Sequence, residues 1–76
     1  MDREMLQMRL EEAERHVVQG LRHIAAQEQI VVNFSRLGYD TTEARRLLAN
    51  FYASQVQHTH HRESILQQLG QKSLSG

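Results

Sequence analysis

The chain has 76 residues, and its nine Lys and Arg residues balance nine Asp and Glu residues. Such a neutral chain lacks the cationic excess that favours binding to a phosphate backbone, so we expect no nucleic-acid partner. It contains no cysteine, which excludes disulfides, thiol catalysis and thiolate metal sites. This length allows one domain, 1–76, whose core is so small that self-association is the economical way to stabilise it.

The longest aliphatic run, residues 30–32, is much shorter than the roughly 18 to 20 apolar residues of a membrane span. The first residues alternate in charge and lead into no apolar segment, so we expect no secretory signal. The prediction is a cytoplasmic protein with no membrane partner.

The first predicted element is a helix over about residues 3–37. Its seam positions recur at alternating spacings of four and three, the heptad pattern of a coiled coil. They are Leu6, Leu10, Ala13, Val17, Gly20, Ile24, Gln27, Val31 and Phe34. The chain has no proline and only four glycines, as two long uninterrupted helices require.

A turn over residues 38–40 is expected where this first pattern ends. Gly38 can adopt the left-handed conformation that closes a helix, because it has no Cβ. Asp40 is then predicted to cap the next helix in a capping box, in which the side chains of Asp40 and Glu43 bind each other's amides. Thr41 is the alternative cap.

The second predicted helix covers about residues 41–69 and ends at Gly70, and the tail 70–76 is expected to fray. Because the connection is short, the helices must pack antiparallel, so the predicted fold class is an all-α, coiled-coil-like two-helix hairpin. The seam positions of the second helix are Ala44, Leu47, Leu48, Phe51, Ser54 or Gln55, His58, His61 or Arg62, Ile65 and Leu69.

The register of the hairpin follows from counting outward from the turn. Residues of the two helices are level when their numbers add up to roughly 78, which places His58 beside Gly20 and Arg62 beside His16. A bulky imidazole or a close helix approach would explain a glycine at position 20, because glycine inside a helix costs about 0.5 to 1 kcal/mol relative to alanine.

The chain carries more apolar residues than one seam can bury, and the excess is concentrated near the turn. Left exposed, these side chains would form an apolar band of the kind that marks a partner site. We therefore expect a homodimer that forms a four-helix bundle, with a lone hairpin or an unidentified protein partner as alternatives. The flanking residues are Val18, Leu21, Ala25, Val32, Ala49, Tyr52, Ala53 and Val56.

Five histidines form the only cluster with metal or proton chemistry. His58 and His61 can share a helix face, and His16 can approach them across the hairpin as a third ligand. The cluster lacks the fixed context of helical zinc motifs such as His-Glu-x-x-His, so we expect seam or surface histidines and no metal or cofactor. Protonation below about pH 6 would add positive charge here, which makes pH-sensitive association a hypothesis to test.

Serine and threonine residues occur without a nucleophile-elbow or oxyanion context, so we expect no enzyme. The predicted function is a protein–protein interaction or structural module that acts by helix packing. Polar residues in the seam would set its specificity, with Arg62 paired to Glu12 or Glu14 across the hairpin. The alternative is a metal- or pH-responsive protein that uses His16 and the other two histidines, His58 and His61.

Four segments carry a resemblance: His16-x-x-x-Gly20-x-x-x-Ile24, Leu37-Gly38-Tyr39-Asp40-Thr41, Leu47-Leu48-x-x-Phe51 and His58-x-x-His61-Arg62. Together they resemble a family of short bacterial helical-hairpin proteins, most familiar from alphaproteobacteria, to which no activity is assigned. The resemblance covers about residues 14–69. It implies a natural bacterial hairpin and transfers no residue role.

Overall fold

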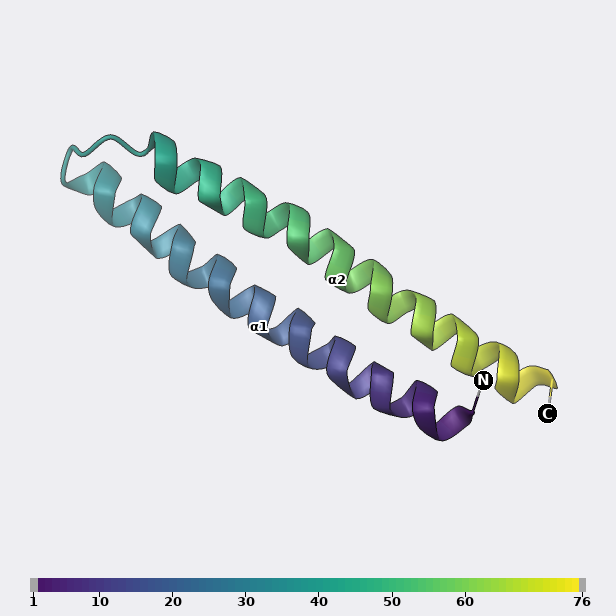
Figure 1. The fold of residues 1–76 in the computed structure, drawn as a ribbon. Coiled ribbons are helices and arrows are strands. Elements are labelled where there is room, and N and C mark those ends of the chain that lie inside the picture. Colours follow the sequence, from purple (N-terminus) through teal and green to yellow (C-terminus); the bar gives the residue numbers. More distant parts are fainter. Residues whose placement is uncertain (1, 76) are drawn as a thin grey trace.

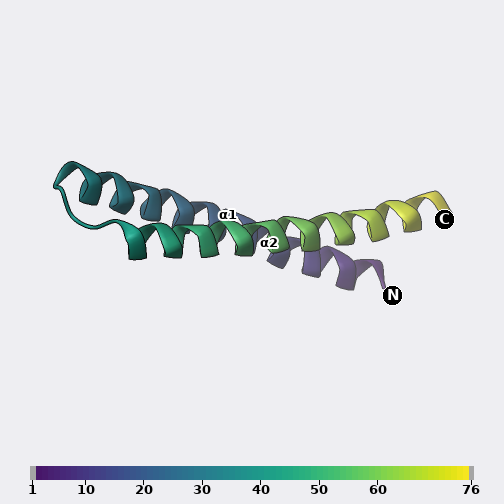
Figure 2. The same ribbon diagram turned by 90° about the horizontal axis from the view of Figure 1, so that it is seen from above.

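The computed structural model describes residues 2–75, and the side chains of residues 2–70. It contains two long helices, α1 (Arg3–Arg36) and α2 (Thr42–Ser75), which lie side by side and antiparallel (Figure 1). The described part is therefore an all-α hairpin, which confirms that part of the predicted fold class. Seen from above, the helices cross at a shallow angle (Figure 2). Neither helix, over the part of the chain that is described, has a stretch long and apolar enough to pass through a bilayer.

The start of α1 is set by Asp2. Its carboxylate accepts a hydrogen bond from the Glu4 amide at 3.3 Å, which satisfies one of the free amides at a helix start. The Asp2 carbonyl accepts the first helical hydrogen bond, from the Leu6 amide at 3.1 Å. Glu4 also lies in the first turn, where its negative charge favours the positive end of the helix dipole.

The end of α1 is a Schellman motif around Gly38, which has the left-handed φ of 78° that the sequence predicts. The Gly38 amide donates to the Ser35 carbonyl at 3.2 Å, and the Tyr39 amide donates to the Phe34 carbonyl at 2.9 Å. The rings of Phe34 and Tyr39 pack edge to face with their centroids 5.7 Å apart. This apolar contact accompanies the motif, so the chain reverses at one defined point.

The start of α2 corrects the predicted cap. Thr41 is the cap residue, because its carbonyl accepts the first helical hydrogen bond at 2.8 Å. The Asp40 carboxylate reaches only two residues along the chain, to the Thr42 amide at 3.0 Å and its hydroxyl at 2.7 Å. These two bonds lower the pKa of Asp40 below its ordinary value. Glu43 pairs with Arg46 at 3.0 Å instead, so the expected capping box does not form.

The far end of α2 also differs from the prediction, because the helix passes through Gly70 and continues to Ser75. Within the described residues, Gly38 is the glycine with a positive φ, so Gly70 does not adopt the conformation that ends a helix. Glycine weakens a helix without breaking it. The predicted fraying concerns the residues beyond Gly70, whose side chains lie outside the described part of the structure.

The seam between the helices follows the heptad pattern. Where the sequence left two choices in α2, Gln55 and Arg62 lie half-buried in the seam, whereas Ser54 and His61 are exposed. Seam positions therefore alternate at spacings of three and four along both helices, as in a left-handed coiled coil. The buried residues are Leu6, Ala13, Val17, Ile24, Gln27 and Val31 in α1, with Ala44 and Ile65 in α2.

The register differs from the predicted one by about one helical turn. His16 contacts His58, and His23 contacts Phe51, each pair with ring centroids 5.7 Å apart. The residue numbers of both pairs add up to 74, so His58 does not lie beside Gly20. The connection folds back along α1 before α2 begins, and α2 therefore starts short of the end of α1 (Figure 1).

Candidate functional site

The eight residues predicted to flank the seam are all exposed. Among the larger side chains, the exposed fraction runs from 44% for Tyr52 to 56% for Val56. Seven of the eight share one side of the hairpin. When the seam residues are given heptad positions a and d, these seven occupy positions b and e, next to the seam: Val18, Leu21, Ala25, Val32, Ala49, Tyr52 and Val56. We call these seven residues the apolar face; Ala53 lies one position further out.

A hydrogen bond shows that the b and e positions of both helices lie on the same side. The Tyr52 hydroxyl donates to Glu28 Oε2 at 2.5 Å, which joins an e position of α2 to an e position of α1. This bond and the charge of the nearby carboxylate favour the neutral phenol, so the pKa of Tyr52 is raised above its ordinary value. The apolar face therefore spans both helices, with the Tyr52–Glu28 pair near its centre and Arg45 at a further exposed e position of α2.

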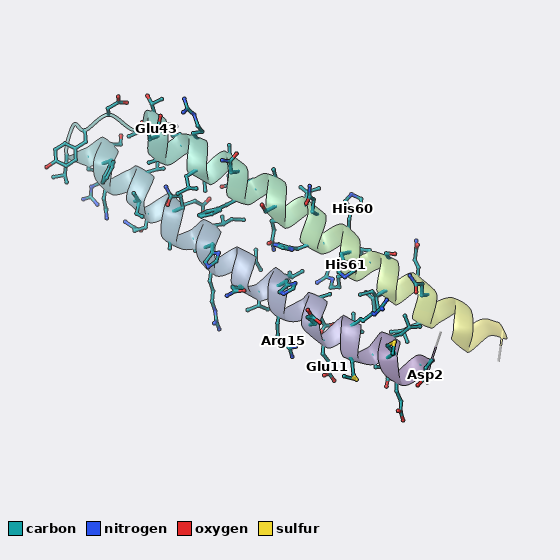
Figure 3. All side chains as sticks on the ribbon, viewed as in Figure 1. Asp2, Glu11, Arg15, Glu43, His60 and His61 are labelled. Carbon is teal, nitrogen blue, oxygen red and sulfur yellow. The ribbon has the colours of Figure 1, made fainter. Side chains whose placement is uncertain are left out.

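Toward the open end of the hairpin, carboxylates replace apolar residues at the b and e positions. Glu4, Glu11 and Glu14 occupy b and e positions of α1, and Glu63 occupies a b position of α2. All four are exposed, and Leu66 is the large apolar residue among them. In Figure 3 the Glu11 side chain extends away from α2. The apolar face thus gives way to an acidic segment, made of these four glutamates, at the open end.

The helix-interior glycine Gly20 faces Gln55. A Cβ on residue 20 would overlap Gln55 Oε1 and would lie 2.9 Å from its Cδ. Gln55 Nε2 donates to the Val17 carbonyl at 2.9 Å, and Gln27 Nε2 donates to the Ala44 carbonyl at 3.0 Å. Each helix therefore sends one amide to the backbone of the other, and both bonds hold the register.

Arg62 corrects a second expectation. It pairs with its neighbour Glu63 at 3.2 Å, and not with Glu12 or Glu14 across the hairpin. In the observed register Arg62 is level with residue 12, but the Glu12 and Glu14 side chains are both exposed, and Glu63 is the carboxylate next to Arg62. The Arg62 Nε atom is buried without a hydrogen-bond partner. The predicted cross-hairpin ion pair is therefore absent from the described side chains.

The structure brings together two of the three predicted histidines. The rings of His16 and His58 are in contact, and with His23 they line a hollow of about 130 Å³. His61, the third predicted residue, is exposed and does not line this hollow. Over the described side chains, no three His, Cys, Asp or Glu residues are grouped so as to hold a metal ion. His23 is the contributor that the sequence reasoning missed, and its seven-residue spacing from His16 was the available signal.

A larger hollow of about 730 Å³ runs along the outside of α1. All of its lining residues belong to this one helix, among them Glu11, Arg15 and Arg22. Figure 3 shows the Arg15 side chain pointing away from α2. A groove with no second wall does not enclose a substrate or exclude water. The apolar face is therefore the feature of the described surface that best fits a functional site.

No protein-family model, curated protein or solved structure matches this chain. The resemblance to short bacterial hairpin proteins stays a prediction. Function is argued below from the geometry of the apolar face.

Proposed function

We propose that this protein is a non-enzymatic interaction module that works by packing its apolar face against the helices of a protein partner. The proposed partner is a second copy, and two hairpins together would form a four-helix bundle. The stripe formed by Val18, Leu21, Ala25 and Val32 supports this proposal, because spacings of three, four and seven residues are those by which helices pack on one another.

The surface area of the hairpin is the observation that carries the proposal. A compact protein of this mass, 8.9 kDa, exposes about 4,800 Å² by the usual scaling. The hairpin exposes 5833 Å². The excess of about 1,000 Å² is slightly more than the roughly 800 Å² that each partner contributes to a stable interface. The hairpin therefore exposes enough surface for a second copy to cover an interface of ordinary size on the apolar face.

The thin core of the hairpin supports the same proposal. Leu6 is the large side chain that is fully buried, and the other buried apolar residues include two alanines, Ala13 and Ala44. Two packed helices bury only one stripe of each, and chains of this size commonly need oligomerisation to be stable. A second copy on the apolar face would give each helix a second buried stripe.

Absolute mass in solution tests the proposal. Light scattering across a range of protein concentrations is expected to give a mass near twice 8.9 kDa. The Leu21→Glu variant should be monomeric, because it places a charge in the apolar face. Gln67→Glu adds the same charge at an exposed position on the outside of α2, so it should remain dimeric. A monomeric wild-type chain would contradict the homodimer and leave an unidentified protein partner as the alternative occupant.

A second candidate function rests on the contact between His16 and His58. The two ring centroids are 5.7 Å apart, so charges on both rings would repel each other at short range. Glu12 lies one turn before His16, and Arg62 lies one turn after His58, so the neighbouring charges are of opposite sign. In this candidate, the histidine cluster would bias the association of the hairpin. The proposed setting, a bacterial cytoplasm, rests on the sequence alone.

A further inference from the structure

We infer that the two copies of the dimer lie in opposite directions, so that the turn of each hairpin covers the open end of the other. This inference rests on the proposed function, because it assumes that a second copy occupies the apolar face. It adds the geometry of the complex: a two-fold axis that lies between the two apolar faces, perpendicular to the long axis of the hairpin, and passes beside Ala25 and Ala49.

The two alanines mark the centre of the apolar face. Level residues have numbers that add up to 74, so Ala25 and Ala49 lie at the same level, on the same side of the seam. Both are exposed. The distance between packed helices depends on the side chains at the contact, so two small residues permit the closest approach here. A second hairpin can therefore cross at this level with its own two alanines facing them.

The three valines of the apolar face are placed symmetrically about this level. Val32 lies seven residues toward the turn from Ala25, and Val18 lies seven residues toward the open end. Val56 is level with Val18 in the observed register. A two-fold axis at the alanines therefore sets Val32 of one copy against Val18 and Val56 of the other. Valines then meet valines on both sides of the axis.

The charges decide between the two directions. If both turns lay at the same end, equivalent residues of the two copies would lie at the same height along the bundle. The Glu11 and Glu14 carboxylates of one copy would then lie level with those of the other. Like charges juxtaposed across an interface are unfavourable. In the opposite direction, Glu14 is eleven residues from the axis and comes level with Arg36 of the second copy. The acidic segment then approaches a basic residue near the turn.

The polar pair at the centre of the face favours the same direction. In the observed register Tyr52 is level with residue 22, three residues from Ala25 toward the open end. Glu28 lies three residues from Ala25 toward the turn. The two-fold axis therefore brings Glu28 of each copy level with Tyr52 of the other. With both turns at one end, Glu28 would instead lie level with Glu28. Opposite directions thus keep the two Glu28 carboxylates about six residues apart along the helices, while each stays bound to the Tyr52 hydroxyl of its own copy.

A distance measurement between the copies tests this geometry. The chain has no cysteine, so a Ser64→Cys variant carries a single nitroxide label, at an exposed position away from the apolar face. Ser64 is level with residue 10 of its own copy. In the reversed copy, Ser64 comes level with residue 40 of the first. The two labels are then about 30 residues apart along the helices, or about 45 Å at 1.5 Å per residue. With both turns at one end, only the width of two helices separates the labels, about 20 to 25 Å.

Pulsed electron spin resonance on the labelled protein, with its mass measured on the same sample, separates the outcomes. A dimer with a distance near 45 Å supports the inference. A dimer with a distance near 20 to 25 Å overturns the opposite direction and leaves the proposed function intact. A monomer overturns both.

A charge variant provides a second measurement. Glu14→Gln should weaken the dimer about two- to fivefold, the usual effect of losing an exposed pairing, here with Arg36 of the second copy. Glu12→Gln is the matched control on the other side of α1, and should leave the dissociation constant unchanged. A tighter dimer for Glu14→Gln would indicate repulsion between identical residues and would overturn the inference.

Discussion

Gly20 lies opposite Gln55, and the missing side chain of the first makes room for the amide of the second. A Cβ at residue 20 would overlap Gln55 Oε1, while Gln55 Nε2 donates to the Val17 carbonyl at 2.9 Å. The glycine therefore has a packing reason, although it lies in the interior of a long helix. A shift by one turn would remove this fit, so the two residues help to select the observed register.

The first prediction concerns Gly20→Ala. Alanine favours the helix by about 1 kcal/mol, but displacing the Gln55 amide costs about 1 to 3 kcal/mol, so the free energy of unfolding should fall by about 1 kcal/mol. In a Gln55→Ala background the overlap is gone, and Gly20→Ala should instead raise the free energy of unfolding by up to about 1 kcal/mol. Urea unfolding followed by circular dichroism measures both. Equal effects in the two backgrounds would show that Gln55 does not occupy the space beside residue 20.

The second prediction uses the same substitution at the turn. Gly38 has a φ of 78°, so Gly38→Ala should lower the free energy of unfolding by about 1 to 2 kcal/mol through backbone strain. Gly70→Ala is the matched control, because nothing lies within 4 Å of its Cβ position and its backbone is helical. It should raise stability by up to about 1 kcal/mol. A stabilising Gly38→Ala would argue against the Schellman turn.

The third prediction concerns the apolar face. Leu21 is 55% exposed in the hairpin, and we expect Leu21→Glu to weaken the dimer at least about 100-fold, since a charge would be buried in the interface. The helical content of the variant should remain, because Leu21 lies exposed beside the seam and is not buried in it. Sedimentation equilibrium gives the dissociation constant. An unchanged dissociation constant would show that the interface lies on another side of the hairpin.

The fourth prediction concerns Tyr52. Its hydrogen bond to Glu28 raises the phenol pKa, so ionisation should begin above the ordinary tyrosine range. The stabilisation from this group is present below the unfolded pKa and is lost as the pH rises through the folded pKa. Absorbance at alkaline pH in a Tyr39→Phe background follows this one phenol. Glu28→Gln should lower the pKa toward its ordinary value, and no change would contradict the contact.

The fifth prediction tests the second candidate function. If the charge state of His16 and His58 biases association, the dissociation constant of the dimer should differ between pH 5 and pH 7. His58→Gln removes one of the two charges and should reduce this difference. His60→Gln is the control, since His60 is exposed and extends away from α1 in Figure 3. Equal pH dependence in wild type and His58→Gln would remove this candidate.

Much of the hairpin follows from local sequence pattern. The heptad spacing predicts the buried side of α1, with Leu6, Val17 and Ile24 in the seam, because residues three and four apart share a helix face. Gly38 predicts the turn, since only a residue without a Cβ adopts its left-handed conformation at no steric cost. These features depend on residues close together in the chain, where the covalent geometry limits the alternatives.

The register and the side-chain partners were decided by the tertiary structure alone. The path from Gly38 to Thr41 folds back along α1, and this shifts the facing residues by about one turn. It thereby places Gln55 beside Gly20. Heptad spacing is unchanged when one helix slides by a turn, so sequence periodicity cannot distinguish these registers. The choice depends on how the connection bends and on which long-range amide contacts then fit.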